Sequence, residues 1–190
     1  MSKQSSVAQI FLWLFVISLG IELGGGLYET LVIMPLWSAA PPDSVVAYYL
    51  HNVANPQFKP NAGGRFWMFF TPLVGLSAIA ALLSGLKTPP EHRRWRMAGT
   101  IPAVIVVIST FAWFVPNIIK LFSEDVTQMS AQELTSLTNW WVRLNWMRAI
   151  VYSAAWLAAL RALSIPSKVE INDEKLDFAR FEPNSLLEKD

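Results

Sequence analysis

Hydrophobic residues gather in long stretches that are almost free of charged side chains. There are four such stretches, at residues 10–21, 66–86, 101–115 and 149–163. With its flanking residues, each stretch reaches the length of about 20 residues that a helix needs to cross a bilayer. The pattern therefore predicts an all-α fold, an antiparallel bundle of four transmembrane helices.

Prolines, glycines and polar residues between the stretches set the expected helix ends. We expect helices at about residues 7–34, 65–86, 98–117 and 139–163. Pro35 is expected to end the first helix, because proline breaks the hydrogen-bond ladder of a helix. A long outer loop, broken by several prolines, follows at residues 35–64 and contains a short helix that begins at Asp43. The transmembrane domain then covers residues 1–163, and residues 164–190 form a polar tail.

Basic residues fix the expected orientation in the membrane. Lys87, Arg93, Arg94 and Arg96 lie within ten residues of each other, in the turn between the second and third helices. The positive-inside rule places such a turn in the cytoplasm. Both termini are then cytoplasmic, the loop at residues 35–64 lies outside, and the protein is integral to the plasma or inner membrane.

Composition removes several classes of function. The chain is 53% hydrophobic and only 15% charged, and its formal charge of +1 gives no indication of a nucleic-acid partner. Because it has no cysteine, disulfides and thiolate metal sites are excluded. Of the two histidines, His92 lies in the basic turn and His51 in the outer loop, so we expect no metal and no cofactor.

Three charged residues fall inside the predicted spans: Glu22, Glu29 and Arg148. Charges inside a membrane helix usually face the bundle interior and each other. Counted from the outer ends of their helices, Glu29 and Arg148 lie at similar depth, so we expect them within direct ion-pair or one-water distance of each other. Thr71 and Thr110 are expected at the same depth. Glu22 lies deeper, next to no evident cation.

The fourth helix carries a polar face beside this pair. Trp141, Asn145, Arg148 and Tyr152 repeat at helical spacing and predict one face of that helix. His51 is expected at the mouth of the bundle, as a general base or hydrogen-bond donor. Trp37, Trp67 and Trp140 are expected at the outer boundary, where aromatic belt residues lie, and Gly24, Gly25 and Gly26 are expected in a close helix contact.

Several short motifs together resemble the anthrone oxygenase-like family of small four-helix membrane proteins, over residues 15–163. They are the segments 26–29 and 34–37, the segment 65–67, the basic segment 93–96 and the spacing from Trp141 to Arg148. The resemblance implies oxidation of polycyclic phenolic anthrones by molecular oxygen without a recognised metal or flavin. The site residues that it implies are Tyr28, Glu29, Trp37, His51, Arg65, Asn145 and Arg148.

These observations lead to one main hypothesis, a membrane-embedded protein that binds a lipophilic, aromatic or phenolic small molecule. Its catalytic form is a cofactor-free oxygenase, in which Glu29 or His51 accepts a proton while Arg148 and Asn145 stabilise the oxyanion. The residues expected to bind substrate are Glu22, Tyr28, Trp37, Arg65, Trp67, Trp141 and Tyr152.

The alternative is a non-enzymatic protein, either a membrane accessory subunit or a proton-coupled carrier that uses Glu22 and Glu29. The partners expected are membrane lipid, the lipophilic molecule and either a second copy or another membrane protein. A cavity of a few hundred cubic ångströms lined by Glu29, Arg148 and Trp141 favours the binding function, and a tightly packed seam favours the structural one.

Overall fold

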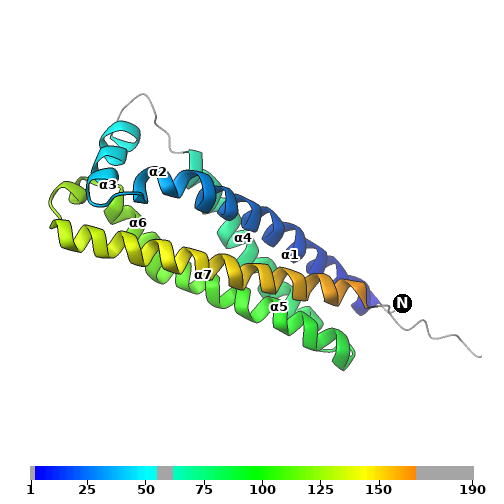
Figure 1. Cartoon of the computed structure of the whole chain (residues 1–190). Helices are drawn as coiled ribbons and strands as arrows, with labels where there is room; N and C mark the ends of the chain where they lie inside the picture. Colours follow the sequence, from blue (N-terminus) through cyan, green and yellow to red (C-terminus); the bar gives the residue numbers. More distant parts are fainter. Residues whose placement is uncertain (1–2, 55–61, 166–190) are drawn as a thin grey trace, which may run out of the picture.

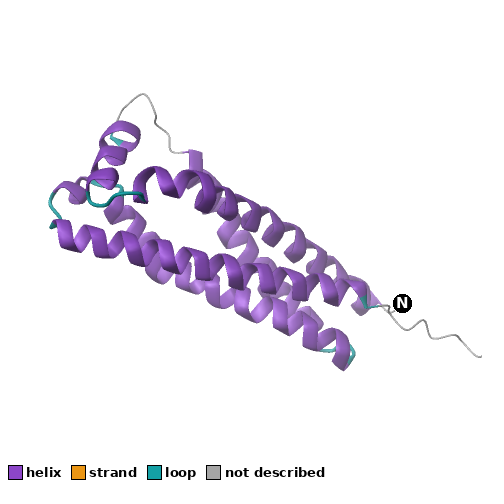
Figure 2. Ribbon diagram, in the orientation of Figure 1, coloured by secondary structure: helices purple, strands orange, loops and turns teal. Residues whose placement is uncertain are grey.

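The computed structural model describes residues 3–54 and 62–165, and all regular secondary structure within them is helical (Figure 2). The all-α prediction is confirmed. The first long rod consists of α1 (Lys3–Tyr28), η1 (Glu29–Ile33) and α2 (Met34–Ser38), and α4 (Ala62–Gly85) is a separate helix. A second rod consists of α5 (Pro90–Ser109), η4 (Thr110–Phe114) and α6 (Val115–Leu121), and α7 (Ala131–Ser164) is the last long helix. The short segments are α3 (Asp43–Tyr48), η2 (Tyr49–Val53) and η5 (Glu124–Thr127).

The long helices pack lengthwise into an elongated bundle (Figure 1). Helix α1 packs against α4 and α7, and α5 packs against the same two helices. The start of α1 lies beside the end of α7, whereas α3 lies at the opposite end (Figure 1). We call the end with the start of α1 the basal end, and the end with α3 the apical end.

Three helical segments are long and apolar enough to cross a membrane: Ser6–Ser38, Gly64–Gly85 and Pro90–Leu121. This finding agrees with the first three predicted spans. Helix α7 is 34 residues long but contains more polar residues, and it is not among the three.

The first helix does not end at Pro35, contrary to the prediction. The π-helical turn η1 precedes this proline, which occupies the first turn of α2, and the rod continues to Ser38. A residue in the first turn of a helix needs no partner for its N–H, so the missing N–H of Pro35 costs little there. Pro116 follows the π-helical turn η4 in the same way, at the start of α6.

Two other helices begin earlier than predicted. Helix α5 begins at Pro90, because proline is well placed in a first turn, so the basic segment 93–96 is helical. Helix α7 begins at Ala131, where the Ser130 hydroxyl accepts a hydrogen bond from the Glu133 N–H. Ser130 and Glu133 have the spacing of a capping box, and the sequence could have revealed this start.

The predicted outer loop, residues 35–64, is largely helical where the structure describes it, and we call it the outer segment. Residues 35–38 belong to α2, and α3 and η2 cover residues 43–53. The rest of the predicted loop at residues 55–61, and the tail from residue 166 onward, lie outside the described residues.

The core has two parts. The basal cluster contains Leu12, Phe15, Leu19, Val74 and many alanines of α4, α5 and α7. The apical cluster is aromatic, and its largest members are Trp37, Tyr49, Phe114 and Trp141. Between them lies a layer of charged and polar side chains from α1, η1, α4 and α7, which we call the charged layer: Glu22, Glu29, Thr30, Thr71, Asn145, Arg148 and Tyr152.

Candidate functional site

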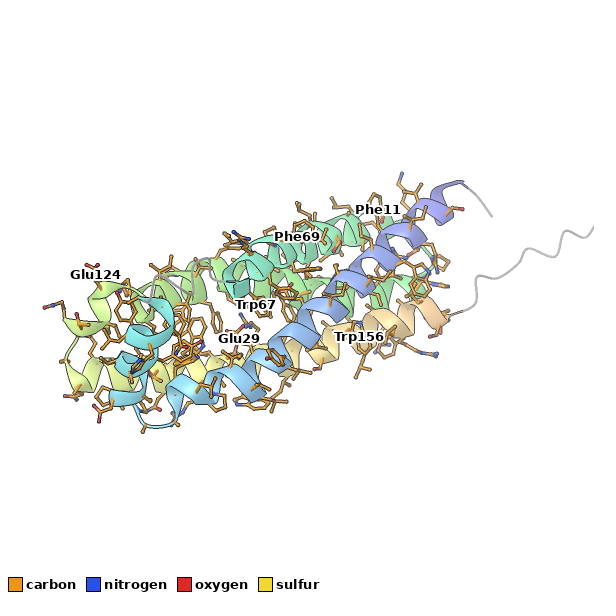
Figure 3. The ribbon with its side chains drawn as sticks, turned by 90° about the horizontal axis from the view of Figure 1, so that it is seen from above. Phe11, Glu29, Trp67, Phe69, Glu124 and Trp156 are labelled. Atoms are coloured by element: carbon orange, nitrogen blue, oxygen red, sulfur yellow. The ribbon has the colours of Figure 1, made fainter. Side chains whose placement is uncertain are left out.

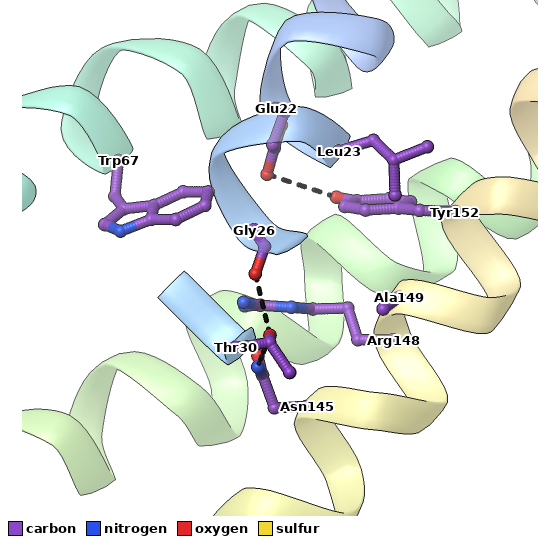
Figure 4. A pocket seen from close by; sticks show the side chains of 9 residues that line it. All are labelled: Glu22, Leu23, Gly26, Thr30, Trp67, Asn145, Arg148, Ala149 and Tyr152. Carbon is purple, nitrogen blue, oxygen red and sulfur yellow. Dashed lines mark hydrogen bonds between the residues drawn. The ribbon is translucent and has the colours of Figure 1, made fainter. Parts of the chain in front are cut away.

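Glu22 is the most enclosed carboxyl group of the charged layer, with 3% of its surface exposed. Its Oε1 atom accepts a hydrogen bond from Thr71 Oγ1 at 3.0 Å. The same atom accepts another from Tyr152 Oη at 3.4 Å (Figure 4). Its Oε2 atom is buried and has no hydrogen-bond partner. Helices α1, α4 and α7 thus meet at this side chain, and one of its oxygens remains available.

Arg148 lies between two aromatic rings. Its guanidinium carbon is 4.7 Å from the centre of the Phe114 ring and 5.7 Å from that of the Trp67 ring. Such cation–π contacts stabilise a cation that is partly removed from water. The electrostatic neighbours of the guanidinium are Glu29, Tyr152 and Glu22, in that order.

Glu29 and Arg148 do not form a direct ion pair, and the other expected arrangement, a separation of one water molecule, stays a prediction. Among the described residues, no nitrogen of Arg148 lies within 4.0 Å of a carboxylate oxygen. Glu29 is half-buried, and its neighbours are the Arg148 guanidinium and the indole N–H of Trp67 (Figure 3). Glu22, for which no cation was expected, also faces Arg148, so one cation serves two carboxyl groups.

Asn145 connects α7 to the first rod. Its Nδ2 atom donates to Thr30 Oγ1 at 2.6 Å, and the Thr30 hydroxyl donates to the Gly26 carbonyl at 2.7 Å (Figure 4). A weaker contact joins Nδ2 to the Met34 sulfur at 4.0 Å. The Asn145 Oδ1 atom is buried and has no partner.

A cavity of about 10 Å³ lies at the centre of these groups. Its lining residues are Glu22, Leu23, Gly26, Thr30, Trp67, Asn145, Arg148, Ala149 and Tyr152 (Figure 4). A cavity of this size holds one water molecule or one hydroxyl group, and no aromatic ring. Among the described residues, this cavity is far smaller than the few hundred cubic ångströms that would favour the binding function, and neither Glu29 nor Trp141 lines it.

Several residues predicted for the site lie elsewhere. Tyr28 has 59% of its surface exposed, and Arg65 and His51 are also exposed. Trp37 is 1% exposed and packs edge-on against Trp141 in the apical cluster, so it is a core residue and not a membrane-belt residue.

Tyr48 takes the position over the charged layer that was expected for His51. Burial, followed by the negative charge of Glu29, raises the pKa of the Tyr48 phenol. Val45 and Tyr49, from the same outer segment, are buried in the apical cluster. The outer segment therefore covers the apical end, with Tyr48 in the electrostatic field of Glu29 and His51 exposed.

Sequence reasoning missed Thr30 and Phe114, and it placed Thr71 beside Glu29, although Thr71 bonds Glu22. Thr110 does not line the cavity, and its hydroxyl bonds the Val106 carbonyl of its own helix. Thr30 and Phe114 belong to two of the three π-helical turns among the described residues, η1 and η4. Such turns are often found at functional sites, and a proline just beyond each of them was the available signal.

Within the described part of the chain, no group of three or more His, Cys, Asp or Glu side chains could hold a metal ion. The chain matches no protein-family model, and no curated protein or solved structure is significantly similar to it. The resemblance to the anthrone oxygenase-like family therefore stays a prediction.

Proposed function

We propose that the protein crosses the membrane four times, with α7 as the fourth span. Its exposed face from Trp146 to Leu157 is apolar, with Met147 60%, Ile150 67% and Leu157 61% exposed. The polar side chains of the same segment, above all Arg148 and Tyr152, face the other helices. Such an arrangement presents hydrocarbon to lipid and keeps charge inside the bundle.

The basal end would be cytoplasmic. Lys87, Arg93 and Arg94 are exposed there, at the turn between α4 and α5, and Arg161 is exposed near the end of α7. The positive-inside rule favours this orientation. Arg96 does not contribute to the surface charge, because it is buried and donates to the Ala8 and Ala81 carbonyls.

In this membrane setting, the charged layer binds the hydroxyl group of a lipophilic, phenolic or otherwise aromatic molecule. The observation that carries the proposal is a pair of buried acceptors without partners, Glu22 Oε2 and Asn145 Oδ1, beside one hydroxyl-sized cavity. Unpaired buried acceptors are costly, and the single hydrogen of a ligand hydroxyl would satisfy one of the two. The body of the ligand would take the place of the half-buried Trp67 ring, which lines the cavity.

Oxygenase activity is the catalytic form of this proposal. Glu29 does not line the cavity but neighbours Arg148, so it would accept the proton of the bound phenol through a bridging water, and Arg148 would stabilise the resulting oxyanion. His51 has no part in this scheme, because it is exposed.

The second candidate is a non-enzymatic membrane protein in which the charged layer holds the helices together. The cavity volume of about 10 Å³ favours it, because the layer is packed more tightly than a preformed ligand site. Such a protein would carry no small molecule beyond lipid.

Native mass spectrometry of the protein in mild detergent separates the two candidates. If the layer binds a ligand, the wild type should carry a small molecule that Asn145→Leu loses and Trp67→Ala retains. Ser153→Ala is the matched control, because the Ser153 hydroxyl bonds only the Ala149 carbonyl of its own helix. A wild type and a Trp67→Ala variant that both carry lipid alone would support the non-enzymatic candidate.

A further inference from the structure

The charged layer contains more acid than base. Two carboxyl groups, Glu22 and Glu29, face the single guanidinium of Arg148. Tyr152 adds a phenol but no cation. An uncompensated charge in a low-dielectric interior is costly, so a neutral layer needs one further positive charge, a proton or a small cation.

The two oxygens of Glu22 differ in a way that indicates where a proton would sit. Oε1 receives both hydrogen bonds, from Thr71 and from Tyr152, as the carbonyl oxygen of a carboxylic acid does. Oε2 receives none, although it is buried. A protonated carboxyl group donates one hydrogen bond, and Oε2 is the atom that is free to do so.

The orientation of the Asn145 amide is set by its neighbours. The Thr30 hydroxyl gives its hydrogen to the Gly26 carbonyl, so it can only accept from Asn145. The amide nitrogen must therefore face Thr30, which leaves Oδ1 as an acceptor that needs a donor.

The cavity that both residues line has room for a single water molecule. Glu22 and Asn145 both line the cavity, each with 3% of its surface exposed, and the cavity volume of about 10 Å³ matches one water. Water has two donors and two acceptors, so it can accept from Glu22 Oε2 and donate to Asn145 Oδ1.

We propose that Glu22 and the cavity beside it form a proton-binding site, in which the carboxyl group holds one exchangeable proton and passes its hydrogen bond through one water to Asn145. In uptake, a hydronium ion gives its proton to Glu22 Oε2 and leaves as water, and in release the reverse occurs. The charged layer is then neutral, with Glu29 and Arg148 ionised. This site depends on neither the hydroxyl ligand nor the oxygenase activity.

The surroundings of Glu22 support this placement. The charged or titratable groups that face it are Arg148 and Tyr152 of α7, with Glu29 further along its own rod. From α4 it meets Thr71, which is not titratable. From η4, Phe114 faces the layer with a ring against Arg148. No second cation is found around the layer in the described ranges 3–54 and 62–165.

Infrared spectroscopy at pH 7 tests the proposal, because a protonated carboxyl group gives a C=O band that a carboxylate lacks. Exposed carboxylates do not contribute at this pH, since they ionise near about pH 4. The wild type should show one such band, which shifts in D₂O because the proton exchanges. Glu22→Gln should abolish the band, and the matched variant Glu29→Gln should keep it.

Asn145→Leu tests the water, since the band should remain but move in frequency when the acceptor of the bridge is lost. A wild type without the band, or a band that survives in Glu22→Gln, would overturn the proton site, whatever the stability of the variants. An unmoved band in Asn145→Leu would overturn the water bridge. Loss of the wild-type band on addition of sodium ions would assign the site to a metal cation and not to a proton.

Discussion

The basal cluster and the charged layer bury polar groups in different ways. In the basal cluster, Ser18 and Ser77 bond each other at 3.0 Å, and the Trp156 indole donates to the Val16 carbonyl at 3.1 Å. The buried Arg96 has two carbonyl partners for its Nη1 atom, although its Nε is unpaired. In the charged layer, acceptors on both Glu22 and Asn145 lack partners.

Helix packing also differs between the basal end and the charged layer. At the basal end, α5 and α7 touch through backbone, since a Cβ on Gly99 would lie 2.8 Å from the Ala155 carbonyl oxygen. At the charged layer, α1 and α4 meet through rings, since a Cβ on Gly25 would meet the Phe66 ring at 2.7 Å. Backbone contacts are fixed, whereas rings can rotate. The comparison indicates that the helix contacts at the basal end are rigid and close the bundle there. At the charged layer, side chains can rearrange.

The largest expected effect concerns the cation of the layer. Arg148→Leu removes the only cation that the described residues place beside the two carboxyl groups of the charged layer and should cost about 3 to 5 kcal/mol of unfolding free energy. Adding Glu29→Leu should recover much of that loss. Thermal unfolding in detergent measures both, with the exposed Arg143→Leu as a control that should change little. Equal losses of stability in Arg143→Leu and Arg148→Leu would show that the cation of the charged layer contributes no more than an exposed arginine.

The second-largest loss of stability is expected at the backbone contact between α5 and α7 at the basal end. Gly99→Ala places a methyl group against the α7 backbone and should destabilise the protein by about 1 to 3 kcal/mol. Gly24→Ala is the matched control, because a Cβ there meets nothing within 4 Å. It should be neutral or stabilising by up to about 1 kcal/mol. A tolerated Gly99→Ala would contradict the sealed basal end.

Glu22→Gln should have a smaller effect, within about 1 kcal/mol, because the amide keeps the acceptor that Thr71 and Tyr152 use and resembles a protonated carboxyl group. Glu22→Leu should cost more, since it leaves the Thr71 and Tyr152 hydroxyls without that acceptor. Chemical denaturation of both variants gives the difference. A Gln variant as unstable as the Leu variant would indicate an ionised Glu22.

The smallest effect concerns the outer segment and pH. Because the pKa of Tyr48 is raised, its neutral form is favoured in the folded state. The stability that it contributes is present below about pH 10 and is lost as the pH rises through the raised value. Tyr48→Phe should therefore lose less stability than the wild type above that pH in thermal unfolding. Identical alkaline profiles would place Tyr48 away from Glu29.

Hydrophobic stretches predicted the long apolar helices well, because length and composition depend on each segment alone. Helical spacing also placed Asn145, Arg148 and Tyr152 on one face of α7, and the structure brings these three to the cavity. The helix limits at Pro35 and Pro90 were wrong, because a proline is tolerated in the first turn of a helix. The rule that proline ends a helix does not include this exception.

The partners within the layer could not be predicted from depth alone. Glu29 and Arg148 lie near each other, but the π-helical turn at Glu29 and the rings of Trp67 and Phe114 replace the direct ion pair. His51 and Tyr48 are three residues apart, and only the fold of the outer segment decides which of them faces Glu29. Such choices depend on side chains from distant helices.

The claim on which the account rests is that α7 crosses the membrane with Arg148 inside the bundle. The chain has no cysteine, so single cysteines at exposed positions report accessibility without interference. Labelling of intact cells with a membrane-impermeant maleimide should modify Gln132→Cys, near the apical start of α7. It should leave Ile150→Cys unmodified, even after the membrane is permeabilised but not dissolved. Rapid labelling of Ile150→Cys in intact cells would place α7 in water and contradict the account.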